Sequence, residues 1–383
     1  MSFKKAIGKI HLWLGLASGL IVFIIAITGC LFVFQKEISE VVWKKTFFIE
    51  PKQTTVLPLS TLQAKAQAAL GDQPVKYVTT YKAPDRAWEF MAYKTNDTAL
   101  TYFGVAEYYR SVFIDPYDGH ITGILDYKYN FFNIVKYIHW SLLLNTKYGQ
   151  PIVGYSTLVF VLLLISGFIL WWPKRWNKHT KEQAFTIKWK ARFKRLNYDL
   201  HNVLGFYSLI ISLVIALTGM VWALNWFQTT VYVIASRSIT PPVHIEVKSN
   251  TPVIPTTQNP YDIAYAAAVK RLPGTSVWNI EPVNGKDATI DITGYADADV
   301  YYKYDELKFD QYTGKFLHKK NYKEANAGER LIYMNYDIHV GAIGGIPGKI
   351  IAFLAALIAA SLPVTGFIIW LGKRRKKPAT TIH

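Results

Sequence analysis

Four of the nine histidines stand at the edges of long apolar runs. His11 and His201 lie where two of these runs begin, and His139 and His339 lie shortly before two others. Two imidazoles from facing helices are the axial ligand set of a b-type haem. A neutral imidazole also binds zinc or copper, and an isolated histidine at a membrane interface often makes only hydrogen bonds. The pattern therefore indicates a haem or metal site, with four structural histidines as the simpler alternative.

The elements that must position these histidines are predicted to be membrane-spanning helices. Each apolar run has about 20 residues or more without a charge, enough to cross roughly 30 Å of hydrocarbon. The runs cover residues 11–34, about 152–172, about 203–227 and about 350–371. Across the whole chain 51% of residues are hydrophobic and only 18% are charged, against about 25% charged in ordinary soluble domains. This composition argues against a soluble enzyme and against a disordered chain.

The excess of positive charge lies between the predicted spans and at the ends of the chain. The formal net charge is +17, and residues 174–195 hold nine Lys or Arg and one acid, Glu182. Residues 373–377 are all basic, whereas the long loops 39–136 and 228–336 are nearly balanced. By the positive-inside rule, both termini and the short middle loop are cytoplasmic and the two long loops lie outside. The charge thus predicts contact with anionic lipids rather than a nucleic-acid surface.

Cys30 is the single cysteine of the chain. One cysteine excludes an internal disulfide framework, a zinc site built on several cysteines and covalent CxxCH haem attachment. The segment Ile27-Thr28-Gly29-Cys30 resembles the end of a lipoprotein signal peptide. The third run carries the same pattern as Leu217-Thr218-Gly219-Met220, which favours an ordinary position within a span. Whether Cys30 is lipidated stays open.

Self-comparison predicts an internal duplication. The matching segments are 9–29 with 199–219, 113–123 with 308–318, 137–151 with 337–348, and 166–175 with 365–374. His11 then matches His201, and His139 matches His339. Because each half holds an even number of spans, both halves have the same orientation, and a pseudo-twofold axis runs along the membrane normal. The axis gives one matched histidine pair at each membrane face.

The two long loops are predicted to form small α+β domains. Residues 59–70 and 261–272 are amphipathic helices, and β-rich segments at 87–94, 109–114, 288–293 and 301–309 are joined by Gly-containing turns. Each loop is expected to pack one helix on a small antiparallel sheet. The predicted division of the chain into spans, loops and tail is 1–38, 39–136, 137–176, 177–198, 199–228, 229–332, 333–372 and 373–383.

Two haems stacked across the bilayer are the cofactor arrangement that this symmetry favours. Gly15 and Gly205 follow their histidines by four residues on the same helix face, which would let a flat macrocycle approach the backbone. The later histidines sit on short outer segments, separated from their spans by breaks at 147–151 and 341–348. Zinc or copper transport would favour acids or sulfur ligands within the spans. The spans contain no acid and little sulfur.

Several motifs resemble the PepSY-associated transmembrane helix family, which includes iron-regulated inner-membrane proteins and ferric-siderophore reductases. They are K-I-H-L-W-L-G-L-A-S-G at 9–19, the L-T-G span ending at 217–219 and G-F-I-L-W-W-P at 167–173. The resemblance implies four spans, two PepSY-like periplasmic domains and reduction of Fe(III)-siderophores outside the bacterial inner membrane. It also implies bound haem b, with the family's haem ligands carried over onto His11, His139, His201 and His339.

The sequence offers no electron source of its own. The middle loop has about 30 residues, too short for a nicotinamide or flavin domain, and no GxGxxG follows a strand. Electrons are therefore expected from a membrane quinol or a redox partner protein. Two other functions stay open. One is a non-enzymatic PepSY module that binds peptides or restrains a protease, and the other is a transporter of the intact siderophore.

Overall fold

The computed structural model describes residues 2–242, 245–250, 257–281 and 283–374. The chain forms two compact units. The helical unit comprises Met1–Val33, Val135–Gln228 and Ile338–His383, and the sheet unit comprises Phe34–Ile134 and Thr229–Asp337. Most of the predicted basic tail, residues 375–383, lies outside the described residues.

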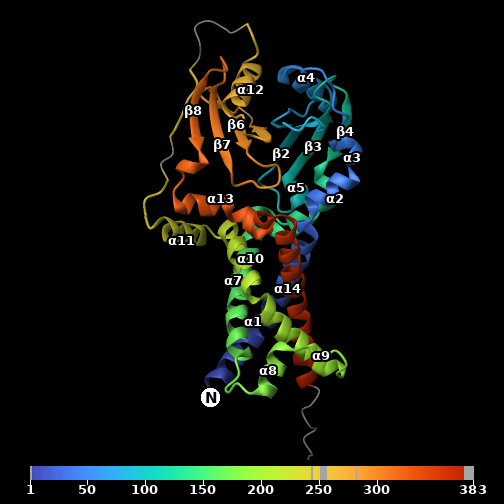
Figure 1. Ribbon diagram of the computed structural model, residues 1–383, viewed down its shortest axis with the longest axis vertical. Coiled ribbons are helices and arrows are strands. Elements are labelled where there is room, and N and C mark those ends of the chain that lie inside the picture. The colour runs from blue at the N-terminus through green and yellow to red at the C-terminus, as the bar shows by residue number, and fades with distance from the viewer. Residues whose placement is uncertain (1, 243–244, 251–256, 282, 375–383) are drawn as a thin grey trace, which may run out of the picture. The chain divides into compact units, whose positions relative to one another are not determined.

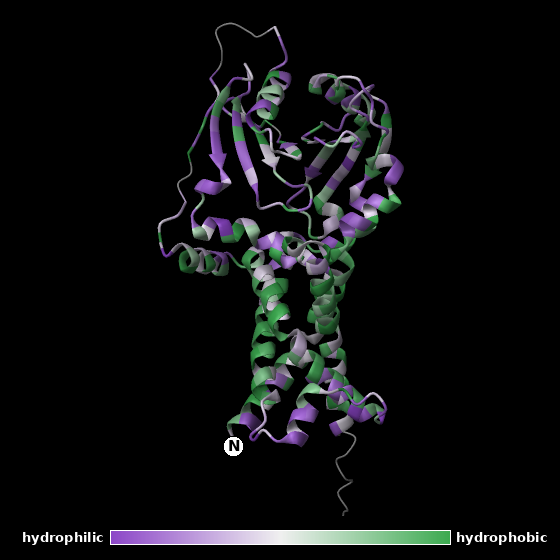
Figure 2. Cartoon of the chain, viewed as in Figure 1, coloured by the Kyte–Doolittle hydropathy of each residue, from purple (hydrophilic) through white to green (hydrophobic). Residues whose placement is uncertain are grey.

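Four long apolar helices build the helical unit. They are α1 (Phe3–Val33), α7 (Thr146–Trp171), α10 (Gly205–Ala223) and α14 (Gly345–Arg374). The segments long and apolar enough to cross a membrane are Phe3–Val33, Thr146–Trp171, Phe193–Ala223 and Ala342–Lys373. Figure 2 shows hydrophobic residues along most of each helix. The four predicted spans are confirmed as candidate spans.

The four helices pack as a ring in which α1 and α10 do not share a side. Helix α1 packs against α7 and α14, and α10 packs against the same two helices (Figure 1). Helices α1 and α10 therefore stand at diagonal corners of the bundle. The helix that leads into α10 consists of α9 (Phe193–Asp199) and a π-helical turn, Leu200–Leu204. Helix α8 (Lys178–Phe185) precedes them, with Asn177 and Thr180 forming a capping box.

Two short helices carry the remaining matched histidines close to their ends. They are α6 (Phe131–Ser141) and α13 (Ala327–His339). In the second half the chain turns at Gly341 and Gly345, with φ of 77° and 61°, inside the predicted break 341–348. Glycine accepts this left-handed backbone without a steric penalty.

The predicted break at 147–151 is wrong. Leu142 and Leu143 make the reversal, with φ of 56° and 59°, and α7 already begins at Thr146 and continues through Pro151. The Asn145 side chain accepts a hydrogen bond from the Lys147 N–H and caps the new helix. Proline this close to a helix start removes only one intrahelical hydrogen bond, so the helix persists.

The strands of both long loops join in one antiparallel sheet with the order β4-β3-β2-β1-β5-β6-β7-β8. The strands are β1 (Tyr77–Tyr81), β2 (Trp88–Thr95), β3 (Ala106–Ile114), β4 (Ile121–Asp126), β5 (Val277–Ile280), β6 (Thr289–Tyr295), β7 (Tyr304–Asp310) and β8 (Phe316–Asn321). The order reads as four consecutive strands on each side of the β1–β5 contact, where Thr79 lies opposite Asn279. The sequence predicts an antiparallel sheet in each loop but not their junction.

Both predicted loop helices cover one face of this sheet. Helices α4 (Leu59–Leu70) and α12 (Pro260–Arg271) share a buried apolar core with the strands, including Leu62, Phe90, Ala264 and Ile292. Side chains alternate along each strand, so the opposite face carries polar groups such as Glu89. The other helices of this unit are α2 (Gln35–Val42), α3 (Lys44–Phe47) and α5 (Tyr102–Val105), and α11 (Asn225–Ser236) leads into it.

Candidate functional site: two histidine pairs

The four matched histidines come together as two pairs inside the helical unit. His11 of α1 and His201 of the π-helical turn have ring centroids 6.4 Å apart. His139 of α6 and His339 of α13 have ring centroids 6.0 Å apart. Each pair therefore takes one ring from each half of the chain. We call His11 and His201 the first pair, and His139 and His339 the second pair.

In the first pair, a hydroxyl group from a neighbouring helix holds one nitrogen of each ring. His11 Nδ1 lies 2.9 Å from Ser166 Oγ of α7, and His201 Nδ1 lies 2.9 Å from Thr365 Oγ1 of α14. Both hydroxyl groups also donate to backbone carbonyls of their own helices. These contacts use Nδ1, which leaves Nε2 as the nitrogen available to a metal. A second partner of this kind fixes the orientation of a ligating imidazole.

The second pair repeats the arrangement on α1 and α10. His339 Nδ1 lies 2.9 Å from Thr218 Oγ1 and 3.0 Å from the Ile215 carbonyl oxygen. His139 Nδ1 lies 2.8 Å from the Ile25 carbonyl oxygen and 3.4 Å from Thr28 Oγ1. Burial lowers the pKa of both His139 and His339. The neutral imidazole is the form that ligates metals.

A glycine follows each of the four hydroxyl residues and lies against the ring that the hydroxyl holds. A Cβ built on Gly29, Gly219 or Gly366 would lie 3.2 Å from Cε1 of His139, His339 or His201, respectively. The same Cβ on Gly167 would lie 3.4 Å from Cε1 of His11. A Cβ at Gly29, Gly219 or Gly366 would crowd the ring, and one at Gly167 would touch it. A Ser-Gly or Thr-Gly dipeptide thus forms the seat of every histidine. Sequence analysis missed this role, although the repeated dipeptides were visible in the matched segments.

Gly15 and Gly205, predicted to admit a macrocycle, face leucine side chains. A Cβ on Gly15 would lie 3.8 Å from Leu163 Cδ2, and one on Gly205 would lie 3.5 Å from Leu362 Cδ2. These are ordinary packing distances between α1 and α7 and between α10 and α14. A cofactor contact at these two glycines stays a prediction.

The two pairs lie far apart along the bundle. His11 and Thr28 both belong to α1 and are 17 residues apart in the chain. At a rise of about 1.5 Å per residue, this spacing corresponds to roughly 25 Å. The second pair contacts α1 at Thr28, so the pairs are separated by most of the thickness of a hydrocarbon core.

The donor set suits a cofactor that brings most of its own ligands. Among the described residues, no three His, Cys, Asp or Glu side chains gather in a group that could hold a bare metal ion. A metal ion held by protein alone normally needs three or four ligands, whereas haem iron needs only axial ligands. Each pair supplies two imidazoles, so the residues present fit a bis-histidine haem.

Four apolar helices long enough to span a bilayer, with similar geometry at two internal histidine pairs, are typical of a polytopic membrane protein. The sequence profile of the PepSY-associated TM region matches residues 9–373. The chain therefore belongs to this family. A comparison with curated proteins gave no match.

Proposed function

We propose that this protein is a b-type dihaem electron-transfer protein of the bacterial inner membrane. It would reduce Fe(III)-siderophores on the periplasmic side and so release iron. His11 and His201 would hold one haem, and His139 and His339 would hold the other.

The observation that carries the proposal is the spacing of the rings within each pair. An imidazole nitrogen binds a first-row metal at about 2.0–2.1 Å. Two imidazoles on opposite sides of one metal would therefore have ring centroids about 6 Å apart. The two pairs have centroid separations of 6.4 Å and 6.0 Å. The same spacing occurs twice, on different helices, and each ring has its Nδ1 engaged elsewhere.

The protein's own residues would orient the ligands and insulate the path. A bound haem supplies an iron that accepts and releases one electron. The Ser-Gly and Thr-Gly seats fix each imidazole, which favours a low reorganisation cost. The apolar surfaces of α1, α7, α10 and α14 exclude water between the pairs, and α1 spans the roughly 25 Å that separates them.

The direction of transfer rests on charge. The basic segment 174–195 and the basic ends support a cytoplasmic location for both termini by the positive-inside rule. With this orientation the first pair would lie at the cytoplasmic face and the second at the periplasmic face. Electrons would enter from membrane quinol or a redox partner, and anionic lipids would contact the basic segment. Siderophores hold Fe(III) with hard oxygen donors, and reduction to Fe(II) weakens that hold.

We further propose that the chain is an internal duplication whose two long loops form PepSY-like domains. The strand order supports this, because four strands of one loop and four of the other flank the β1–β5 contact. The matched seats support it too. Thr28-Gly29 corresponds to Thr218-Gly219, and Ser166-Gly167 corresponds to Thr365-Gly366.

Reconstituted vesicles test the function directly. Protein in vesicles that contain quinol would receive an Fe(III)-siderophore and a ferrous-iron chelator outside, without oxygen. We expect Fe(II) to form, and to fall to background with His139→Ala or His11→Ala. His179→Ala is the matched control, since His179 lies on α8 and contacts Gln183. A colourless protein from haem-replete cells would instead favour a non-enzymatic module, and equal iron release from oxidised and reduced protein would favour transport.

A further inference from the structure

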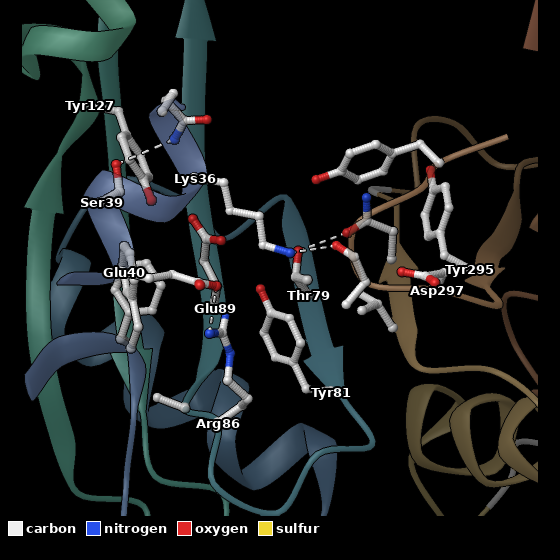
Figure 3. A pocket seen from close by; sticks show the side chains of 18 residues that line it. Lys36, Ser39, Glu40, Thr79, Tyr81, Arg86, Glu89, Tyr127, Tyr295 and Asp297 are labelled. Atoms are coloured by element: carbon white, nitrogen blue, oxygen red, sulfur yellow. Dashed lines mark hydrogen bonds and ion pairs between the residues drawn. The ribbon is translucent and has the colours of Figure 1, made fainter. Parts of the chain in front are cut away.

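A cavity of about 300 Å³ lies in the sheet unit, on the face opposite α4 and α12. Its walls come from α2 and α3, from strands β1, β2, β3, β5 and β6, and from the segments that follow β1, β4 and β6 (Figure 3). Aromatic rings line much of it, namely Phe47, Tyr81, Phe113, Tyr127, Tyr295 and Tyr301. The volume lies at the lower end of the range for small-molecule sites.

The cavity is lined by the buried carboxyl group of Glu89, whose hydrogen bonding is incomplete. Within the described part of the chain, Glu89 Oε1 is buried and has no hydrogen-bond partner. Burial raises the pKa of Glu89, although Ser111 and Tyr127 hydrogen-bond its carboxyl group. A buried acceptor without a partner costs about 1–3 kcal/mol, so a group that persists in this state requires an explanation.

The second half of the sheet shows what the matching position contains. There Asp291 of β6 lies opposite Lys308 of β7, and the two form an ion pair of 2.5 Å. In the first half Glu89 of β2 lies opposite Phe113 of β3. The segment that begins at 113 matches the segment that begins at 308. The first half therefore has the carboxylate but has a phenyl ring in place of the matching ammonium group.

The basic groups that line the cavity are already engaged. Arg86 donates from Nη1 to Glu40 Oε1 over 2.9 Å and stacks on the Tyr81 and Phe48 rings. Lys36 donates to the Ala298 carbonyl oxygen over 2.7 Å and pairs with Asp299. Arg86 also acts on Glu89 through space, but its hydrogen bond goes to Glu40.

These contacts exclude one class of ligand and favour another. An entering anion would have to break the Arg86–Glu40 or Lys36–Asp299 pair. An entering cation would meet the unpartnered oxygen of Glu89 within walls of aromatic rings, and aromatic faces attract organic cations. A bare metal ion is disfavoured, since no three suitable ligands gather in the described residues.

We propose that this cavity binds a small organic ammonium ion, whose N–H groups donate to Glu89 in the place that Lys308 takes beside Asp291. The site is separate from the histidine pairs and does not depend on the proposed electron transfer. Both halves of the sheet line the cavity, but its ligand-binding carboxyl group comes from the first half, whereas in the second half Lys308 already pairs with Asp291 and Glu306.

Calorimetric titration of the full-length protein with n-pentylamine at neutral pH tests the proposal, with 1-pentanol and pentanoate as uncharged and anionic analogues. We expect saturable binding of the amine alone, weakened at least tenfold by Glu89→Gln. Phe113→Lys is expected to abolish it, because the new ammonium group copies Lys308. Phe113→Leu is the control that keeps an apolar residue.

Phe113 is buried in a small apolar cluster with Ala87 and Leu125, so Phe113→Lys is interpreted only if its thermal unfolding stays cooperative. Glu89→Gln keeps the shape of the side chain and serves if Phe113→Lys fails to fold. Equal binding of amine and alcohol would overturn the proposal, as would an unchanged Kd in Glu89→Gln. No saturable binding of the amine with a Kd below about 1 mM would also overturn it.

Discussion

The matched halves of the chain are alike in the helical unit and differ in the sheet unit. Around the histidines, both halves repeat the same parts, with a ring, a hydroxyl and a glycine at all four positions. On the polar face of the sheet the halves differ, because Asp291 has Lys308 and Glu89 has Phe113 opposite it. The two halves therefore match where each gives one ring to a histidine pair and differ at the polar face of the sheet.

Each histidine pair takes one ring from each half, so both halves would share each of the proposed haems. Both halves also line the cavity beside Glu89, but Glu89 has Phe113 opposite it where Asp291 has Lys308. This comparison leads to four expected outcomes, in order of decreasing effect.

Replacement of a paired histidine should have the largest effect. His201→Ala removes one axial ligand of the first pair and leaves the second pair intact, so the haem-to-protein ratio should fall by about half. His339→Ala should cause the same loss at the other pair. Soret absorbance per unit of protein measures it. If both variants retained full absorbance, the pairs would not be the ligands.

Crowding a glycine seat should have the next largest effect. In Gly219→Val the side chain would occupy the space of His339 Cε1, 3.2 Å from the new Cβ, and should displace the ring. We expect a several-fold drop in haem retention at the second pair, measured after dialysis against apomyoglobin. Gly372→Ala is the control, because nothing lies within 4 Å of its Cβ position among the described residues. An unaltered Gly219→Val protein would refute the role of the seat.

Loss of a hydroxyl partner should matter more at His11 than at His139. Ser166 is the hydrogen-bond partner of His11 Nδ1, whereas His139 has the Ile25 carbonyl oxygen at 2.8 Å in addition to Thr28. Second partners of metal ligands are typically worth about 10- to 100-fold in affinity. Haem retention should fall about tenfold in Ser166→Ala and less in Thr28→Val. The reverse order would contradict the comparison.

The smallest expected effect is the change that Glu89→Gln makes in the stability of the sheet unit. The Glu89 pKa in the folded state is raised above its ordinary value of 4.5 by burial. Between these two pKa values the folded state binds more protons, so the free energy of unfolding falls as pH rises through that window. Glu89→Gln has no carboxyl group to titrate, so its free energy of unfolding does not fall in this way. The free energy of unfolding of Glu89→Gln minus that of the unaltered protein should grow from near zero at pH 4.5 to about 1 kcal/mol at higher pH. Thermal unfolding across pH checks this, and a constant difference would contradict it.

Much of the fold follows from patterns that the sequence shows directly. Uncharged apolar runs identify the four helices because the bilayer excludes charge over a fixed thickness. The helices at 59–70 and 261–272 follow from their amphipathic spacing, and the structure has them at Leu59–Leu70 and Pro260–Arg271. The pairing of His11 with His201 follows from their matched places in the two halves.

Contacts between distant segments could not be predicted in the same way. The partners of the histidine Nδ1 atoms lie 111 to 164 residues away in the chain, and a hydroxyl within a span normally bonds its own helix. The β1–β5 contact joins segments about 200 residues apart, and short strands with one polar face carry no sign of their partner. The turn at Leu142 and Leu143 was hidden because apolar residues rarely adopt positive φ.

The central claim is that each histidine pair holds one haem, and the haem content of the purified chain tests it most directly. Protein from haem-replete cells would be assayed for haem by the pyridine haemochrome spectrum and for polypeptide by amino-acid analysis. We predict two b-type haems per chain, and none when all four histidines are replaced by alanine. A ratio near zero in the unaltered protein, or a ratio that survives the fourfold replacement, would contradict it.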